Sequence, residues 1–195
     1  MRRLLRTVGG FTLAELLIVI AILGFMMGAL FTLQRQGQLA YLTGAARVEV
    51  QQNARLALDM MITDIRSALP QAGTTQIVTA VDANCATGAP PGTGGGTSIS
   101  FTDQGGTAVA YTLVGASCAT SATGCELQRN GTTVVGGVQQ LQIWCYNASG
   151  ALNATLANIR EIRIQVRTRT ERSAQAGSPG DQHAVVESRV RFRNI

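Results

Sequence analysis

The chain has 195 residues, a length that fits one modest globular domain with an appendage. Its formal net charge is +5, but Arg2, Arg3 and Arg6 precede a long apolar run. Without these three, the chain has 13 arginines and 11 acidic residues. The resulting net charge of about +2 is too small to predict nucleic-acid binding. The absence of lysine excludes a P-loop lysine, a Schiff-base lysine and a catalytic Ser-Lys pair.

An apolar run extends from Phe11 to Leu33 and is interrupted only by Thr12, Glu15 and Thr32. As a helix it would span about 34 Å, more than the roughly 30 Å of a bilayer core. A secretory signal peptide has a shorter apolar region with a small-residue cleavage site after it, so we expect a membrane anchor instead. The preceding arginines predict that the N-terminal end stays cytoplasmic and that the rest of the chain lies outside.

Glu15 is the unusual residue of this run, because an ionised carboxylate in a bilayer costs about 2.5–3.5 kcal/mol on insertion scales. Cleavage between Gly10 and Phe11 would create an α-amino group one helical turn away. We therefore expect Glu15 to form an assembly charge pair with that group, in its own chain or in a neighbouring one. The alternative is an ordinary single-span anchor with a glutamate there by chance.

The sequence GFTLAELLIVIAI, residues 10–22, resembles the type IV prepilin cleavage and methylation motif. In that family a membrane peptidase cuts after the glycine and methylates the new terminus. The resemblance implies that Gly10 and Phe11 form the processing site, that Phe11 is N-methylated, and that Glu15 serves assembly. Residues 1–10 would then be a leader peptide.

Helical periodicity continues beyond Leu33 until Pro70 and Gly73 stop it. We expect one helix with a transmembrane half at 11–33 and an amphipathic half at 34–69. The second half carries an apolar stripe that should pack on a globular head at 70–195. The stripe consists of Val50, Ala54, Leu58, Met61, Ile62, Ile65 and Leu69.

Short β-like runs separated by Gly, Pro, Ser and Thr clusters follow the helix. The predicted fold class is therefore α+β and pilin-like, with the long N-terminal helix packed on a mainly antiparallel β-sheet head. The runs are Ser98–Thr102, Ala108–Val114, Leu127–Arg129, Gln139–Tyr146, Glu161–Thr168 and Val185–Phe192.

All four cysteines, Cys85, Cys118, Cys125 and Cys145, follow the apolar run, which predicts two disulfides in an oxidising compartment. Pairing Cys118 with Cys125 and Cys85 with Cys145 is one of three connectivities that the sequence leaves open. A zinc site is disfavoured because there is no CxxC pair and the single histidine, His183, is distant in sequence. We expect no metal and no other cofactor.

Eight of the 16 arginines lie between Arg160 and Arg193, in two runs whose alternation points them outward. If the runs are neighbouring strands, like charges lie side by side, with Glu161, Glu171 and Glu187 as local relief. Our hypothesis is that this face meets an acidic surface on a companion subunit; the alternative is a solvated basic face. The candidate partner face comprises Arg163, Arg167, Arg169, Arg189, Arg191 and Arg193.

Further segments look like the pattern of PilW-type minor pilins, which are similar to GspJ-type minor pseudopilins of type II secretion. They are residues 52–58, 64–66, 137–143 with Tyr146 and Gly150, 159–164 and 190–194. The resemblance implies a low-copy subunit that primes fibre assembly and lies at the tip. Implied partners are other minor and major pilins, a prepilin peptidase and the inner-membrane assembly platform. Implied locations are the inner membrane, with a single pass and a periplasmic head, and later a cell-surface pilus or pseudopilus.

No recognisable catalytic set is present: the chain has one histidine, no lysine, no HExxH and no GxSxG, so we do not expect an enzyme. An anchored enzyme would need Asp103, Glu126 or Asp181 to meet His183 in a cleft. A binding module whose arginine face captures DNA or an anionic surface at the fibre tip is the other alternative, with nucleic acid the less favoured partner.

Overall fold

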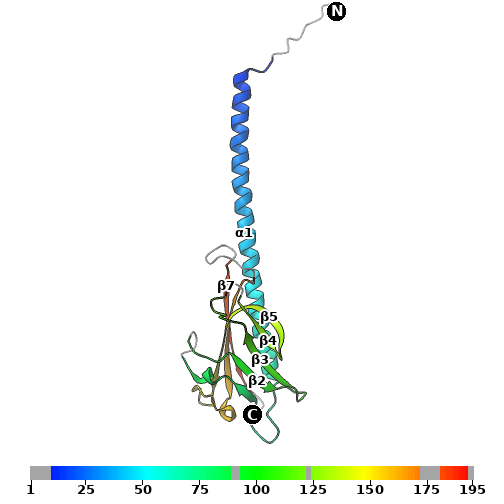
Figure 1. Ribbon diagram of the computed structural model, residues 1–195, viewed down its shortest axis with the longest axis vertical. Coiled ribbons are helices and arrows are strands. Elements are labelled where there is room, and N and C mark those ends of the chain that lie inside the picture. Colours follow the sequence, from blue (N-terminus) through cyan, green and yellow to red (C-terminus); the bar gives the residue numbers. More distant parts are fainter. Residues whose placement is uncertain (1–9, 89–92, 122–123, 172–180, 193–195) are drawn as a thin grey trace, which may run out of the picture. The chain divides into compact units, whose positions relative to one another are not determined.

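The computed structural model describes residues 10–88, 93–121, 124–171 and 181–192. Within them the chain forms one long helix, then seven strands and two short 3-10 turns (Figure 1). The chain divides into two compact units, Met1–Tyr41 and Leu42–Ile195, and helix α1 (Leu13–Ser67) contributes to both. This is the predicted α+β class, with a long N-terminal helix and an antiparallel sheet, and the prediction is confirmed.

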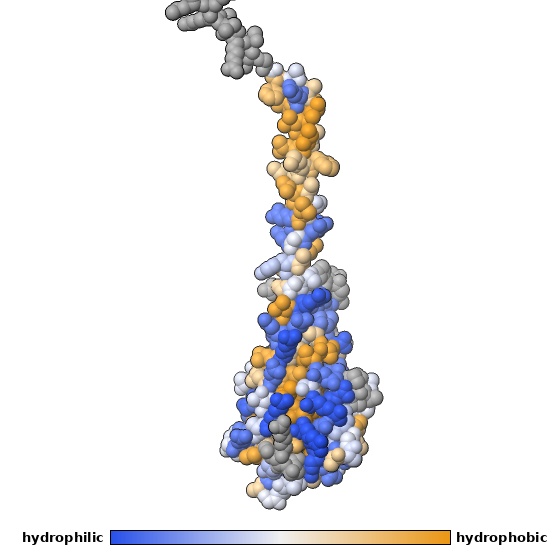
Figure 2. Space-filling view, turned by 180° about the vertical axis from the view of Figure 1, so that it is seen from behind, coloured by the Kyte–Doolittle hydropathy of each residue, from blue (hydrophilic) through white to orange (hydrophobic). Residues whose placement is uncertain are grey.

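The described part of the first unit is the N-terminal portion of α1, which exposes large apolar side chains all round, from Leu13 to Leu33. Figure 2 shows the mainly hydrophobic surface of this portion. By length and composition α1 is able to cross a membrane. Side chains as apolar as Phe25, which is 83% exposed, need a hydrophobic environment that the chain itself does not supply here.

The second unit contains a seven-stranded sheet in which every strand pairs antiparallel with its neighbour in sequence. Six of the strands fall where alternation predicts them, while the four-residue β1 was missed. The bounds are β1 Val78–Val81, β2 Ser98–Thr102, β3 Ala108–Val114, β4 Cys125–Arg129, β5 Thr132–Tyr146, β6 Glu161–Arg169 and β7 His183–Arg191, with 3-10 turns η1 Ala83–Ala86 and η2 Leu156–Asn158.

Strand β5 begins at Thr132, earlier than the expected Gln139. Two glycines, Gly136 and Gly137, weaken the strand pattern of this stretch, and Gly137 has a positive φ of 67°. The register of β5 with β6 also shifts between Val138 and Gln140. Such an irregularity breaks the two-residue alternation from which strands are read.

The core lies between the C-terminal half of α1 and one face of the sheet. The Thr168 hydroxyl on β6 donates a hydrogen bond of 2.8 Å to the Val50 carbonyl of α1. A hydrogen bond therefore joins the helix to the sheet in addition to the apolar contacts. The predicted stripe is buried except for its last residue, Leu69, which is half-buried. Sheet residues that face this core include Ile99, Phe101, Tyr111, Leu127, Leu141, Ile143, Ile162, Ile164 and Val166.

Helix α1 ends at Ser67, before the expected limit at Leu69. Because Leu69 precedes Pro70, helical backbone angles are sterically disfavoured there. The Leu69 N–H instead donates to the carbonyl of Thr102 on β2, at 3.0 Å. The turn that leaves the helix is therefore already tied to the sheet.

A charged contact fastens the same part of the helix to the middle strands. One carboxylate oxygen of Asp64 accepts hydrogen bonds from the Tyr111 hydroxyl on β3 and from Arg129 Nε on β4, both at 2.7 Å. Tyr111 is fully buried, and this burial together with the Asp64 carboxylate raises the pKa of its phenol above the usual range. We call these three residues the Asp64 lock.

Candidate functional site

The expected processing and assembly residues lie at the start of α1. Gly10 and Phe11 are exposed and precede the helix, and Glu15 lies in its first turn. The Glu15 N–H donates to Thr12 Oγ1 at 3.3 Å, and the Thr12 N–H points to the Glu15 carboxylate at 3.5 Å. This reciprocal arrangement is a capping box, which the T-x-x-E spacing of Thr12 and Glu15 already contains.

The capping box explains how Glu15 is accommodated before processing. Its carboxylate lies at the positive end of the helix and beside an amide N–H, but the described residues include no cation within ion-pairing distance of it. Cleavage after Gly10 would place a charged α-amino group on Phe11, directly before Thr12. The expected charge pair of Glu15 with that group stays a prediction.

Two disulfides join the four cysteines of the second unit. Cys85 pairs with Cys145, 60 positions apart, and we call this bond the long-loop disulfide. Cys118 pairs with Cys125, seven positions apart, and forms the short-loop disulfide. The structure thus selects one of the three connectivities, because the register of the strands brings η1 to the end of β5.

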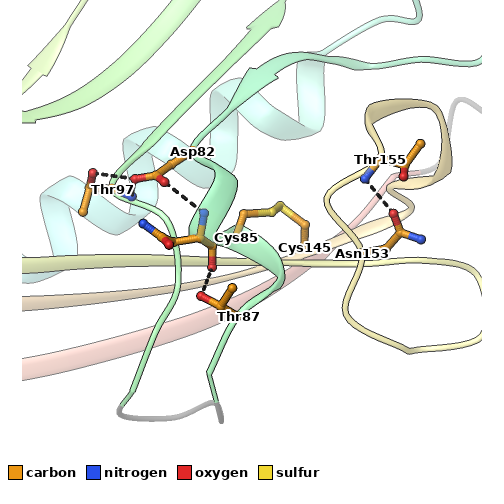
Figure 3. The surroundings of a disulfide bond; sticks show 8 residues. Asp82, Cys85, Thr87, Thr97, Cys145, Asn153 and Thr155 are labelled. Atoms are coloured by element: carbon orange, nitrogen blue, oxygen red, sulfur yellow. Dashed lines mark hydrogen bonds between the residues drawn. A yellow bond between two sulfur atoms is a disulfide. The ribbon is translucent and has the colours of Figure 1, made fainter.

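The long-loop disulfide is supported by a hydrogen-bonded turn (Figure 3). Asp82 caps η1, accepting from the Asn84 N–H at 3.0 Å, and its other oxygen accepts from the N–H and the hydroxyl of Thr97 at 3.1 and 3.0 Å. The hydrogen bond from Asn84 is the main reason that the pKa of Asp82 is lowered; burial opposes it and the Thr97 bonds add to it. Asp82 therefore holds Cys85 in place opposite Cys145.

Strands β6 and β7 are neighbours, and Arg163 lies directly opposite Arg189. The expected like-charge contact is relieved locally. Arg163 Nε donates to Glu187 at 2.7 Å, and Arg189 pairs with Glu161 while its guanidinium lies 4.9 Å from the centre of the Tyr146 ring. These two arginines are largely neutralised within the sheet.

The expected relief residue Glu171 has another position. Its carboxylate accepts from the Asn53 side chain on α1 at 2.9 Å, so it serves the helix contact instead of the arginine rows. Arg167 is exposed on β6 and forms no ion pair among the described residues, and the same holds for Arg191 on β7.

Including Arg169 in an exposed partner face was wrong. Arg169 is only 8% exposed and forms an ion pair of 2.9 Å with Asp181, while its Nη1 donates to the Ser121 carbonyl at 3.0 Å. The loop after β3 therefore covers the outward position that strand alternation assigns to it. Arg193 lies outside the described residues.

Of the acids that an enzyme would require, the structure brings only Asp181 to His183, with 3.3 Å between Oδ1 and Nε2. His183 Nδ1 lies 3.0 Å from the side-chain oxygen of Gln139. Asp103 instead accepts from backbone N–H groups of its own turn, and Glu126 accepts from the Thr133 hydroxyl. The described residues contain no group of three side chains able to hold a metal ion.

Sequence reasoning missed the Asp64 lock, because its residues are 47 and 65 positions apart. The signal that was available is Tyr111 at an inward position of a strand. A buried tyrosine hydroxyl usually needs a hydrogen-bond partner, and Asp64 on the edge of the apolar stripe is a candidate.

Comparison with known families gives a match at the N-terminus. Residues 5–31 match the family model of the prokaryotic N-terminal methylation motif, which covers the expected processing site and most of the apolar run. No curated protein and no solved structure matches the chain. The motif implies processing by a prepilin peptidase, and with the single apolar helix it fits a single-pass, membrane-anchored protein. It supports a type IV prepilin-like protein that is processed at its N-terminus.

Proposed function

We propose that this chain is a minor pilin that helps to prime assembly of a type IV pilus and lies at or near the pilus tip. The observation that carries the proposal is Glu15, an acid in an apolar helix one turn after a Gly10–Phe11 cleavage site, within the matched methylation motif. A buried carboxylate is expensive in lipid unless it is paired. In the assembled fibre, a processed N-terminal amino group would supply the cation that pairs with the Glu15 carboxylate.

The minor rather than major role rests on the head. Its sequence resembles the PilW-type pattern at several segments, and its outward sheet face carries Arg167 and Arg191 without ion pairs in the described part. Unpaired charge on one face suits contact with a different subunit better than repeated contact with identical ones. Other minor and major pilins and the inner-membrane assembly platform are the proposed partners.

The first experiment replaces Glu15 with alanine in the producing cell. Mass spectrometry of the N-terminus should still find cleavage after Gly10 and a methylated Phe11, while the amount of the protein in sheared pili falls strongly. Asp59→Ala, which removes an exposed acid from the same helix, serves as the matched control and should incorporate normally. Normal incorporation of the Glu15 variant would refute the coupling of processing to assembly.

Copy number tests the minor role separately. Quantitative mass spectrometry of sheared pili should find this chain far below the main fibre subunit, and deletion of its gene should lower the number of surface pili. A copy number equal to that of the main subunit would contradict the proposal.

The proposed location is the inner membrane, with the head in the periplasm before assembly and on a surface pilus afterwards. Two disulfides in the second unit support an oxidising compartment for it. A membrane-impermeable thiol reagent, applied to spheroplasts after mild reduction, should label head cysteines. Labelling only after membrane lysis would contradict the periplasmic location.

A GspJ-like minor pseudopilin of type II secretion is the second candidate, since the same processing motif serves both machines. Gene deletion distinguishes them: loss of surface pili favours the pilus, whereas loss of exported enzymes with normal pili favours secretion. A tip module that binds DNA or an anionic surface is favoured only by Arg167 and Arg191. Salt-dependent retention of DNA that is lost on their reversal to glutamate would support that role.

We propose an assembly role, not a catalytic one. The acid–histidine contact of Asp181 and His183 is accounted for by the ion pair with Arg169 and by Gln139. Cells that carry His183→Gln should therefore assemble normal pili. A structural deficit is not expected from this substitution, because glutamine keeps one hydrogen-bonding group near Gln139.

A further inference from the structure

A cleft of about 670 Å³ lies within the second unit, where the end of α1 meets the two edges of the sheet. Ile65 and Ala68 come from α1 and the residue after it, Ile77 directly precedes β1, and Val190 belongs to β7. All four are almost completely buried and form an apolar floor. The volume falls in the range of about 300–1,000 Å³ that is usual for ligand pockets. We call it the seam cleft.

Among the described residues, three arginines form the rim of the seam cleft and none of the lining residues is acidic. Arg189 is engaged with Glu161, but Arg66 and Arg191 are exposed and form no ion pair among the described residues. Two guanidinium groups that have no ion pair in the described part of the chain, placed over an apolar floor, favour an occupant that combines carboxylates with apolar side chains.

The backbone beside the cleft is also unpaired. Strand β7 pairs with β6 on one side and is the last strand of the sheet, so its other side has no strand partner in the described part of the chain. An edge strand offers a row of N–H and C=O groups to which an extended segment can add. Arg189 and Arg191 belong to this edge strand and also line the cleft.

We propose that the seam cleft receives an extended acidic segment of a companion subunit, which adds as a strand to the free edge of β7. Its carboxylates pair with Arg66 and Arg191, and its apolar side chains pack against Phe192, a half-buried residue that also lines the cleft. The identity of the source as a companion subunit rests on the proposed function; the chemistry of the segment rests on the cleft alone.

Charge decides against a second copy of β7 as the occupant. The half of β7 that lines the cleft carries Arg189 and Arg191, so another copy would bring further arginines to a rim that already has three. Like charges in such contacts are destabilising, whereas an acidic segment neutralises the rim.

Binding is tested on the processed full-length protein in detergent micelles with its disulfides intact. The probe is a fluorescent nine-residue peptide that alternates glutamate and valine, and the readout is fluorescence polarisation. A peptide with lysine in place of glutamate should not bind. Equal binding of both peptides would overturn the proposal.

The variant is the pair Arg66→Gln and Arg191→Gln, which removes two charges from the cleft without breaking an ion pair of the described residues. Loss of two charge-assisted hydrogen bonds should weaken binding by about tenfold or more. The matched control is Arg55→Gln with Arg167→Gln, also one arginine of α1 and one of the sheet, both exposed and outside the cleft. A loss in the control equal to that in the cleft pair would assign binding to general basic charge and overturn the proposal.

Strand addition has its own readout. Peptides methylated at alternate backbone nitrogens lose the hydrogen-bond donors of one edge only. One of the two methylation patterns should abolish binding and the other should preserve it. If both patterns bind as well as the unmodified peptide, no strand is added to β7 and the proposal fails.

Two outcomes separate this inference from the proposed function. A cleft variant that fails to bind the peptide and loses a companion subunit on co-purification supports the seam cleft. Unchanged peptide binding by the cleft variant would refute the proposed role of the seam cleft, and the proposed function, which rests on Glu15, would be unaffected. If a single-stranded DNA oligonucleotide binds through Arg66 and Arg191 and the peptide does not, the cleft recognises nucleic acid and the proposal is overturned.

Discussion

Removing the Asp64 carboxylate should destabilise the head more than its partial exposure suggests. Asp64→Ala leaves the Tyr111 hydroxyl, which is fully buried, without the acceptor that lies 2.7 Å away. A buried polar group without its partner costs about 1–3 kcal/mol. The side chain of Arg129 is 34% exposed, so water replaces its lost ion pair and this part contributes less than about 1 kcal/mol.

The sum is a loss of about 2–3 kcal/mol in the free energy of unfolding, most of it due to Tyr111. Tyr111→Phe removes the hydroxyl itself and leaves Asp64 with Arg129, so it should cost only about 1 kcal/mol. In that background Asp64→Ala has little more to lose. The double-mutant cycle should therefore give a coupling energy of about 1–2 kcal/mol between the two positions.

The chain supplies its own probe, since Trp144 is the single tryptophan and is fully buried in the sheet. Its emission reports unfolding of the head without a signal from the apolar part of α1. Urea titrations of the full-length protein in detergent, followed at this tryptophan, give the midpoint and slope for each variant.

Asp59→Ala is the control, because Asp59 is an exposed acid of the same helix and should change stability by less than about 0.5 kcal/mol. The reasoning is refuted if Asp64→Ala unfolds within about 0.5 kcal/mol of the unchanged protein, or if the two substitutions are additive.

Three further predictions concern the turn and the disulfides. Asp82→Ala should lower the free energy of unfolding by about 1–3 kcal/mol at pH 7. Because folding lowers the pKa of Asp82, the stability that its carboxylate adds is fully present above the usual pKa of 3.8 and should be lost as the pH falls through the lower pKa of the folded state. Urea midpoints of both proteins, measured over a series of acidic pH values, test this. Replacing both cysteines of the long-loop disulfide with serine should cost about 4 kcal/mol against about 2.5 for the short-loop disulfide, since the enclosed chain is longer; comparable losses by the same fluorescence assay would contradict this entropic reasoning. Gly115→Ala should impair formation of the short-loop disulfide, because a Cβ there would overlap Sγ of Cys125 and Gly115 has a φ of 144°. If the purified variant has no more free thiols than the unchanged protein, this prediction is wrong.

Features with a short period were predictable from the sequence. The apolar run, the helix and its stripe follow from local periodicity, and the strands β2 and β3 have the limits that alternation gave them. Strand β1 was missed because it has only four residues, and β5 was cut short where Gly136 and Gly137 interrupt the alternation. In both places the sheet, and not local preference, holds the backbone extended.

The expected processing and assembly residues rest on a local pattern of the same kind. Gly10, Phe11 and Glu15 lie within six consecutive residues, and the capping box with Thr12 needs no distant partner. The arginine rows show the opposite case. Alternation points Arg169 outward, but a loop distant in sequence covers it and Asp181 pairs with it.

By itself the sequence determined the apolar helix, its single acid and the alternating strands, because each depends on residues no more than a few positions apart. Only the tertiary structure decided which cysteines pair, which arginines are neutralised and where a cleft remains. Those outcomes depend on strand register and on contacts between residues as far apart as Arg66 and Arg191, which no local pattern records.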